Sequence, residues 1–125
     1  MTSEINYGET PEFKKDFKRL LRKFKSLEDD LELAKIVAIE LFHIQKINNL
    51  STFPIQGFCT ETIQICKIKK FACKALKGKG CKSGIRVIYA YFPSQNKVDF
   101  IQIYYKNRDD TDCNYERIKE YLKSF

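Results

Sequence analysis

Apolar side chains recur at helical spacing near the start of the chain and predict a first helix over about residues 11–25. The positions on its apolar face, which we expect in the core, are Phe13, Phe17, Leu20, Leu21 and Phe24. Thr10 is a suitable N-cap for this helix. Pro11 suits its first turn, because an N–H group would have no helical partner there.

A second helix is predicted over about residues 27–47, where apolar residues continue with the same period. Ser26 is its candidate N-cap, and Asp29 follows three residues later, as in a capping box. Because the break between the two helices is short, we expect them to form an antiparallel helical hairpin.

The following part of the chain carries segments of β type. Residues 85–92 and 97–105 are rich in β-branched and aromatic side chains, and residues 63–73 read as a strand before them. Residues 48–62 are predicted as a loop with an aromatic lining, and residues 74–84 as a basic loop that contains glycine.

A short strand at residues 5–7 and a closing helix at residues 115–125 complete the pattern, and the helix is expected to start near Asp110 or Asp112. The predicted order is strand, helix, helix, strand, strand, strand, helix. This order indicates a single α+β domain over residues 1–125. In it a helical hairpin packs on a small antiparallel sheet and the helices cover one face.

Successive strand residues point to opposite faces, so the pattern also predicts how side chains divide between the faces. In the first long strand, Cys66, Ile68, Lys70 and Ala72 would share one face, and Lys67, Lys69 and Phe71 the other. In the last strand, Asp99, Ile101, Ile103 and Tyr105 would share a face. A β-bulge would change this register.

One face could thus gather polar, cationic and aromatic side chains: Lys67, Lys69, Arg86, Gln102, Tyr104 and Lys106. An open sheet face of this kind is a suitable surface for a polyanion. The alternative is an ordinary solvated face, with lysines that discourage pairing with another sheet edge.

Charge strengthens the first interpretation. The chain has 23 Lys and Arg against 16 Asp and Glu, a formal net charge of +7. The excess is concentrated between Lys67 and Arg86, where eight basic residues occur without an acidic one. They are Lys67, Lys69, Lys70, Lys74, Lys77, Lys79, Lys82 and Arg86. Nucleic acid is the leading partner class and an acidic protein the second.

The thiols and the one histidine predict no special chemistry. The five cysteines are an odd number and contain no CxxC pair, so we expect reduced, partly buried thiols and no zinc site. His43 is expected to be a surface or partly packed residue of the second helix. The loop segment Gly78–Gly80 is either a flexible connection or a phosphate-binding loop.

No apolar run approaches the roughly 20 residues of a membrane span. The first residues lack the basic and apolar regions of a secretory signal. The sequence therefore predicts a cytoplasmic protein without membrane contact.

Three runs of residues resemble the RelE/HigB-like toxins of type II toxin–antitoxin modules, in the RelE/ParE superfamily. They are a lysine-rich strand with a basic glycine loop (residues 67–80), the succession Gly84-Ile85-Arg86-Val87-Ile88-Tyr89, and the strand end Ile101-Gln102-Ile103-Tyr104-Tyr105-Lys106. The match is strongest over residues 65–106, and the flanking helices agree with the family in order and length.

The resemblance implies an endoribonuclease that cuts mRNA in the ribosomal A site or, in some members, cuts free RNA. The family uses no metal or other cofactor. The ribose 2′-OH attacks the adjacent phosphate, so the products carry a 2′,3′-cyclic phosphate and a 5′-OH. Such a reaction requires a base, an acid and cations that stabilise the developing charge. The resemblance also implies a cognate antitoxin protein.

Carried over by position, Lys67 and Lys69 match the paired strand lysines of the family, and one of them would act in proton transfer. Arg86 matches the strand arginine and, with Lys106, would bind the phosphate. Tyr115 is the candidate for the acid or base near the closing helix. The expected RNA-binding residues are Lys74, Lys77, Lys79, Lys82, Tyr104 and Arg108, where Arg108 is also an alternative cation for the site and Tyr104 could stack on a base.

Two other functions remain open from sequence. A non-catalytic relative, such as a ParE-like gyrase inhibitor, would lack the catalytic cations. A general RNA-binding module would share the charge without the toxicity. RNA cleavage that is lost when the cations are removed would separate the nuclease from both.

Overall fold

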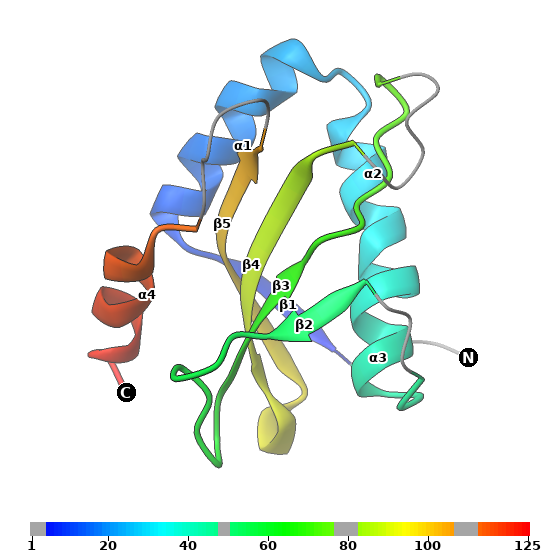
Figure 1. Cartoon of the computed structure of the whole chain (residues 1–125). Coiled ribbons are helices and arrows are strands. Elements are labelled where there is room, and N and C mark those ends of the chain that lie inside the picture. The colour runs from blue at the N-terminus through cyan, green and yellow to red at the C-terminus, as the bar shows by residue number, and fades with distance from the viewer. Residues whose placement is uncertain (1–4, 48–50, 77–82, 107–112) are drawn as a thin grey trace.

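The computed structural model describes residues 5–47, 51–76, 83–106 and 113–125. Its centre is a five-stranded sheet in the order β1-β5-β4-β3-β2 (Figure 1). The strands are β1 (Asn6–Glu9), β2 (Thr52–Pro54), β3 (Gln64–Ile68), β4 (Ile85–Phe92) and β5 (Lys97–Tyr105). Strands β2 to β5 pair antiparallel, whereas β1 runs parallel to β5. The predicted α+β class is confirmed, and the sheet is mixed.

The helices frame this sheet. They are α1 (Pro11–Lys23), α2 (Leu27–Ala34), a π-helical segment (Lys35–Glu40), α3 (Leu41–His43) and α4 (Tyr115–Leu122). The predicted first helix is confirmed, with Thr10 as its N-cap: the Thr10 hydroxyl accepts from the Phe13 N–H at 3.1 Å. The predicted second helix is continuous from Leu27 to His43 but changes its hydrogen-bonding pattern in the middle.

Ser26 precedes α2, but the expected capping box is wrong. The Ser26 side chain caps no helix N–H and instead donates to the Asp30 carboxylate at 2.7 Å. The backbone N–H of Ala75 donates to the Ser26 hydroxyl at 2.8 Å, and the Lys74 N–H points to Asp30 at 3.3 Å. These polar groups tie the segment after β3 to α2, a long-range role that local spacing does not reveal.

Strand β2 lies inside the segment predicted as a loop. It is three residues long and forms an edge of the sheet, where Pro54 is tolerated because one side of the strand needs no ladder hydrogen bonds. A strand this short that contains a proline gives no recognisable strand pattern in the sequence.

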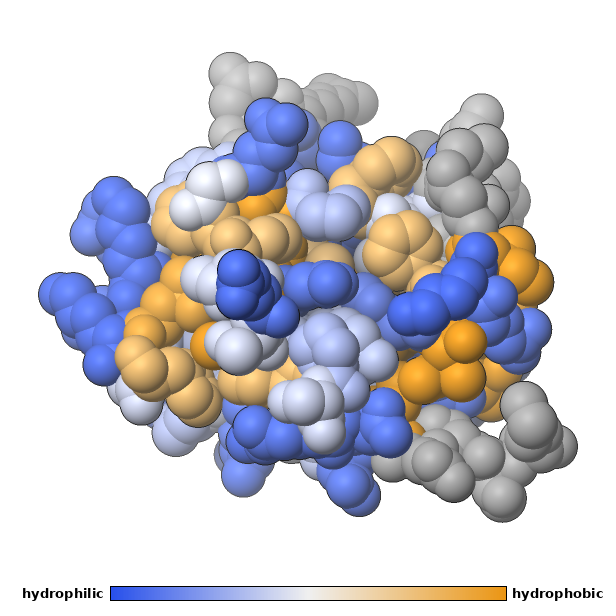
Figure 2. Space-filling view, turned by 90° about the horizontal axis from the view of Figure 1, so that it is seen from below, coloured by the Kyte–Doolittle hydropathy of each residue, from blue (hydrophilic) through white to orange (hydrophobic). Residues whose placement is uncertain are grey.

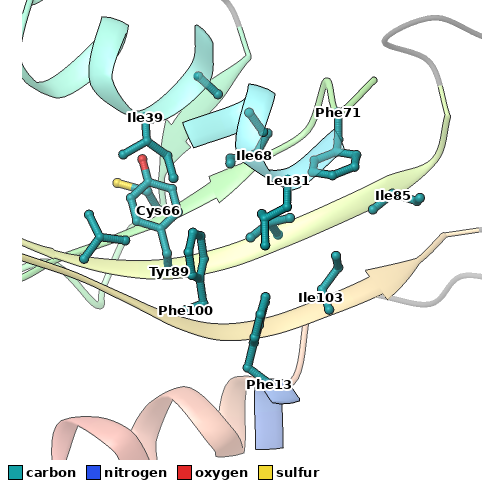
Figure 3. Close-up of a cluster of buried hydrophobic side chains, with 14 of the residues drawn as sticks. Phe13, Leu31, Ile39, Cys66, Ile68, Phe71, Ile85, Tyr89, Phe100 and Ile103 are labelled. Carbon is teal, nitrogen blue, oxygen red and sulfur yellow. The ribbon is translucent and has the colours of Figure 1, made fainter. Parts of the chain in front are cut away.

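The main core lies between the sheet and the N-terminal helices (Figure 3). Phe13 of α1, Leu31 of α2 and Ile39 of the π-helical segment meet sheet residues such as Tyr89 and Phe100 there. Phe24 is also buried, and Phe17, Leu20 and Leu21 are partly buried against this core. The predicted apolar face of the first helix is therefore confirmed.

The opposite face of the sheet carries a second apolar cluster, on which α4 packs through Ile118. Its sheet residues include Ile65, Ile88, Ala90 and Phe92. We call this side of the sheet the α4 face. The expectation that helices cover only one face is wrong, and so is the expectation of a fully open second face: Gln102 and Tyr104 on the α4 face are 9% and 8% exposed.

A β-bulge explains why Asp99 and Ile101 do not share a face with Ile103 and Tyr105 as predicted, whereas Gln102 and Tyr104 lie on the predicted face. The pairing of β4 with β5 shifts between Ile88 and Tyr89, which pair with Gln102 and Phe100. The extra residue, Ile101, joins the α4-face cluster, while Ile103 packs in the main core. A bulge inserts one residue in one strand and so resets the alternation beyond it.

Polar contacts hold α4 in place. The Arg117 guanidinium pairs with the Asp16 carboxylate of α1 and donates to the Ile101 carbonyl at 3.1 Å. The Tyr121 hydroxyl donates to the Asp99 carboxylate at 2.6 Å. The helix starts at Tyr115, after an Asn114 N-cap, so the predicted start near Asp110 or Asp112 is wrong.

His43 is buried, contrary to the expectation of a surface or partly packed position. It is 4% exposed, its Nε2 lies 2.7 Å from the Tyr89 hydroxyl, and its ring stacks on Tyr91 at 4.0 Å. Burial, with a smaller contribution from the charge of Lys46, lowers the pKa of His43 from 6.5 to about 4.

Several apolar side chains of the long helix and of the residues just after its end at His43 remain exposed. They are Leu33, Ile36, Val37, Ile44 and Ile47, each 40% to 59% exposed. Seen from below, orange apolar surface lies at the right edge of the molecule, the side on which α3 lies (Figure 2). We call these five residues the helix stripe. None of the helices within the described ranges is long and apolar enough to cross a membrane.

The buried His43 predicts a pH-dependent stability. Because its pKa is lowered in the folded state, His43 stabilises the fold fully above its unfolded pKa and loses this contribution as the pH falls towards 4. Between about pH 7.5 and about pH 5 the loss should be about 2 kcal/mol. Urea unfolding of the wild type and His43→Gln at a series of pH values checks this, and equal pH slopes for the two proteins would contradict it.

Asp16 pairs with two arginines, Arg117 and Arg19, and we expect their substitutions to lower the stability of the fold by different amounts. Arg117→Met should cost about 2 kcal/mol and speed amide exchange in α4, because it leaves a largely buried Asp16 without its inner partner. Arg19→Met removes the exposed partner of Asp16, at 3.5 Å, and should cost under about 0.5 kcal/mol. Thermal unfolding measures both, and equal costs would refute the role given to Arg117.

Candidate nucleic-acid interface

Sheet register brings predicted site residues from three strands to the α4 face. Lys67 of β3 pairs with Ile88 of β4, which pairs in turn with Gln102 of β5. Directly opposed residues project to the same face. Since Ile88 belongs to the α4-face cluster, Lys67 lies on that face as well.

Arg86 lies one row further along the same face. It pairs with Tyr104 of β5, and its Nη1 donates to the Lys69 carbonyl oxygen at 2.7 Å. The Lys69 N–H donates to the Ser51 carbonyl at 2.8 Å. The backbone of Lys69 is therefore held from both sides, and the Arg86 guanidinium is fixed next to it.

The predicted strand over residues 63–73 is too long at its C-terminal end. Strand β3 ends at Ile68, and Phe71, expected on the face of Lys67 and Lys69, is 1% exposed in the main core. The alternation stops because the chain leaves the sheet after Ile68 and turns Phe71 inward. Lys69 and Lys70 are exposed at this departure point.

A backbone contact with Gly84 places Lys106 at the site. Its N–H donates to the Gly84 carbonyl at 2.8 Å, and a Cβ on Gly84 would meet the Lys106 carbonyl oxygen at 2.6 Å. Gly84 also has φ of +88°, a conformation that side chains disfavour. Glycine is thus required where the start of β4 meets the end of β5, and this places Lys106 next to the Arg86 end of the sheet.

Positive charge from Lys69, Arg86 and Lys106 gathers at this end of the face. Within the described part of the chain, no carboxylate lies within ion-pair distance of Lys69, Arg86 or Lys106. Lys69 and Lys106 are exposed and Arg86 is half-buried. A phosphate at this end of the face would meet positive charge from three chain segments.

Tyr115 and Tyr104 lie on the same side of the sheet as the cations. The Tyr115 ring stacks on Phe58 at 5.7 Å and is 42% exposed. The N–H of Asn114 donates to the Gln102 side chain at 2.7 Å, so the start of α4 is anchored in the row of Lys67. Tyr104 is nearly buried, and a base would have to displace its neighbours to stack on it.

Four of the remaining predicted RNA-binding residues fall in segments that the structure does not describe. Lys77, Lys79, Lys82 and Arg108 lie outside the described residues, as does the segment Gly78–Gly80. Lys74 is exposed, and its backbone is tied to Asp30. Their roles in binding stay predictions.

Phe53 and Phe58 belong to the segment that the sequence predicts as a loop with an aromatic lining. Phe53 lies on β2 directly opposite Lys67, with the Lys69 Nζ 4.9 Å from its ring centroid. The β-type pair Thr52-Phe53 was the one available signal.

The described residues contain no group of three or more His, Cys, Asp or Glu side chains that could hold a metal ion.

No protein-family model matches the chain, and no curated protein does. Similarity appears among solved structures. In the RelE–RelB complex from the archaeon Pyrococcus horikoshii OT3, a chain 13% identical matches with a TM-score of 0.51, over 84% of this chain and 98% of that one. A conserved hypothetical protein of Helicobacter pylori, HP0892, is 18% identical with a TM-score of 0.46, over 81% and 93%.

The similarity to the archaeal complex extends over nearly the whole of the matched chain at very low identity. A likeness at this identity concerns the fold alone. The protein has a RelE-like fold.

Proposed function

We propose that this chain is the toxin component of a type II toxin–antitoxin system and acts as a metal-independent endoribonuclease on mRNA, which inhibits translation. The observation that carries the proposal is the placement of Lys67, Lys69, Arg86 and Lys106 together at one end of the α4 face. A RelE-like fold that had lost its activity would have no need to keep these four cations together.

The proposed reaction is an internal transfer at phosphorus. The 2′-OH attacks the adjacent phosphate, its proton passes to a base, and the bond to the 5′ oxygen of the next nucleotide breaks. That oxygen takes up a proton and leaves as a 5′-OH, while the other product keeps a 2′,3′-cyclic phosphate. Arg86 and Lys106 would bind the phosphate, and Lys67 or Lys69 would transfer a proton, with Tyr115 as a further candidate.

A protein partner follows from the same proposal. The archaeal RelE structure is a complex with RelB, and we propose that a cognate antitoxin binds this chain in the cytoplasm. The helix stripe supports a partner, because five exposed apolar side chains on the long helix and just after its end are more than scattered surface residues require. An amphipathic antitoxin segment would bury them.

The nuclease proposal predicts that cleavage depends on cations of the site and not on charge in general. Lys67→Ala/Lys69→Ala/Arg86→Ala should lower the cleavage rate at least about a hundredfold, because proton transfer and charge stabilisation each contribute about that much. Lys15→Ala/Lys18→Ala/Arg22→Ala removes the same charge from exposed positions of α1 and should cleave normally. Mapping of RNA 5′ ends after induced expression in bacteria, and on purified RNA with and without ribosomes, measures the effect.

Equal loss in both triple variants would contradict the site. Growth arrest without new RNA ends would indicate a gyrase-type or other target. Folded wild-type protein that causes neither arrest nor cleavage would leave a binding module and refute the nuclease proposal.

The partner proposal predicts that the helix stripe and the cation site can be separated. Ile36→Asp/Val37→Asp should abolish co-purification with the co-expressed product of the adjoining gene and leave RNA cleavage unchanged. Lys14→Asp/Lys15→Asp on exposed positions of α1 is the control for added negative charge. Undiminished co-purification of the stripe variant would show that the partner binds elsewhere.

A further inference from the structure

Phe53 is an exposed aromatic side chain at the edge of the cation site. It is 37% exposed, although most large apolar side chains of the sheet are buried. Strand β2 is the outer strand of the sheet, so within the described part of the chain no further strand lies beyond Phe53. The exposed ring of Phe53 is therefore accessible to a polymer that approaches this edge of the sheet.

The position of Phe53 relative to the cations is fixed by backbone pairing. Phe53 is opposite Lys67 in the antiparallel register, with Thr52 and Pro54 paired to Ile68 and Cys66. The Ile55 N–H donates to the Ile65 carbonyl at 2.8 Å and continues the pairing beyond the strand. These contacts hold the backbone of Phe53 opposite Lys67.

The ring also contacts the second lysine. The Nζ of Lys69 lies 4.9 Å from the ring centroid of Phe53, within the range of a cation–π interaction. The Lys69 backbone accepts the hydrogen bond of the Arg86 guanidinium at 2.7 Å. Phe53, Lys69 and Arg86 thus form a connected series from an aromatic ring to a phosphate-binding cation.

Single-stranded nucleic acid needs this combination. Cations bind the backbone, and an exposed aromatic ring gives a base a surface for stacking. Tyr104 is nearly buried and offers little ring surface for this purpose. Tyr115 is exposed, but its ring already stacks on Phe58.

We propose that Phe53 stacks on a nucleobase of the bound RNA and positions Lys69 at the adjacent phosphate. The inference rests on the proposed function and adds a residue to it. Stacking on one ring tolerates any base, because every base has a π-face, so Phe53 contributes affinity and placement without selecting a sequence.

The chain has no tryptophan, so Phe53→Trp provides a single fluorophore at the site. Its fluorescence should be quenched when a short 2′-deoxy oligonucleotide binds, since this probe lacks the attacking hydroxyl and cannot be cleaved. An oligonucleotide of equal length with abasic positions should bind more weakly and quench little. Phe125→Trp, at a ring that packs on Phe92 and Tyr121, is the matched control and should not respond.

Affinity and turnover provide the second readout. Phe53→Leu should weaken binding of the normal oligonucleotide about tenfold or more and leave binding of the abasic one unchanged. Phe53→Tyr should retain both affinities. Phe53→Leu should also lower the cleavage rate at saturating RNA, because Lys69 loses its ring contact. Unchanged thermal unfolding shows that each variant folds.

The outcomes separate the two proposals. Base-dependent quenching at Phe53→Trp without cleavage by the wild type would support stacking and overturn the nuclease proposal. A second outcome is that the wild type cleaves RNA, while Phe53→Leu and the wild type bind the normal probe equally and the abasic probe equally. This outcome would overturn the stacking inference and leave the nuclease proposal intact. Equal quenching by the two probes, or failure of the wild type to bind the probe, would also overturn the inference.

Discussion

Burial of strand β4 on both of its faces is the constraint on which the rest of the structure depends. Val87, Tyr89 and Tyr91 lie in the main core, whereas Ile88 and Ala90 lie in the α4-face cluster. A strand of this kind requires a cover on each side, which the N-terminal helices and α4 supply. It also requires paired neighbours, because its backbone groups have no access to water. The polar residue Arg86 is tolerated only near the end of the strand, and this decides where the cation site lies.

Buried polar groups then select one arrangement of the elements around β4. The Tyr89 hydroxyl meets the His43 ring between the sheet and α3, Asp16 joins α1 to α4, and Asp30 joins α2 to the segment after β3. Each group would be costly if left alone in the interior. The helices must therefore pack in positions where these contacts form, and the ends of β3 and β5 are fixed at the site as a result.

The site itself combines rigid backbone with long, exposed side chains. Antiparallel pairing sets the positions of Lys67 and Arg86, and the Gly84 contact sets that of the exposed Lys106. A sheet holds such residues more precisely than a loop does, and a precise array of cations is what a transition state with charge on phosphorus needs. The edge position of β2 adds an aromatic ring without closing the site.

The sequence by itself determined the α+β order, the apolar face of α1 with its Thr10 cap, and strands β4 and β5, because these depend on local periodicity and composition. It also identified the lysines and the arginine that the RelE-like resemblance assigns to the site. Only the tertiary structure decided what depends on distant partners. The bulge at Ile101 resets the faces of β5, the long-range partners of Ser26 replace its helix cap, and the core contacts bury His43. Strand β2 forms because β3 supplies its hydrogen bonds, and it thereby brings Phe53 to the side of Lys67, a placement that no local pattern contains.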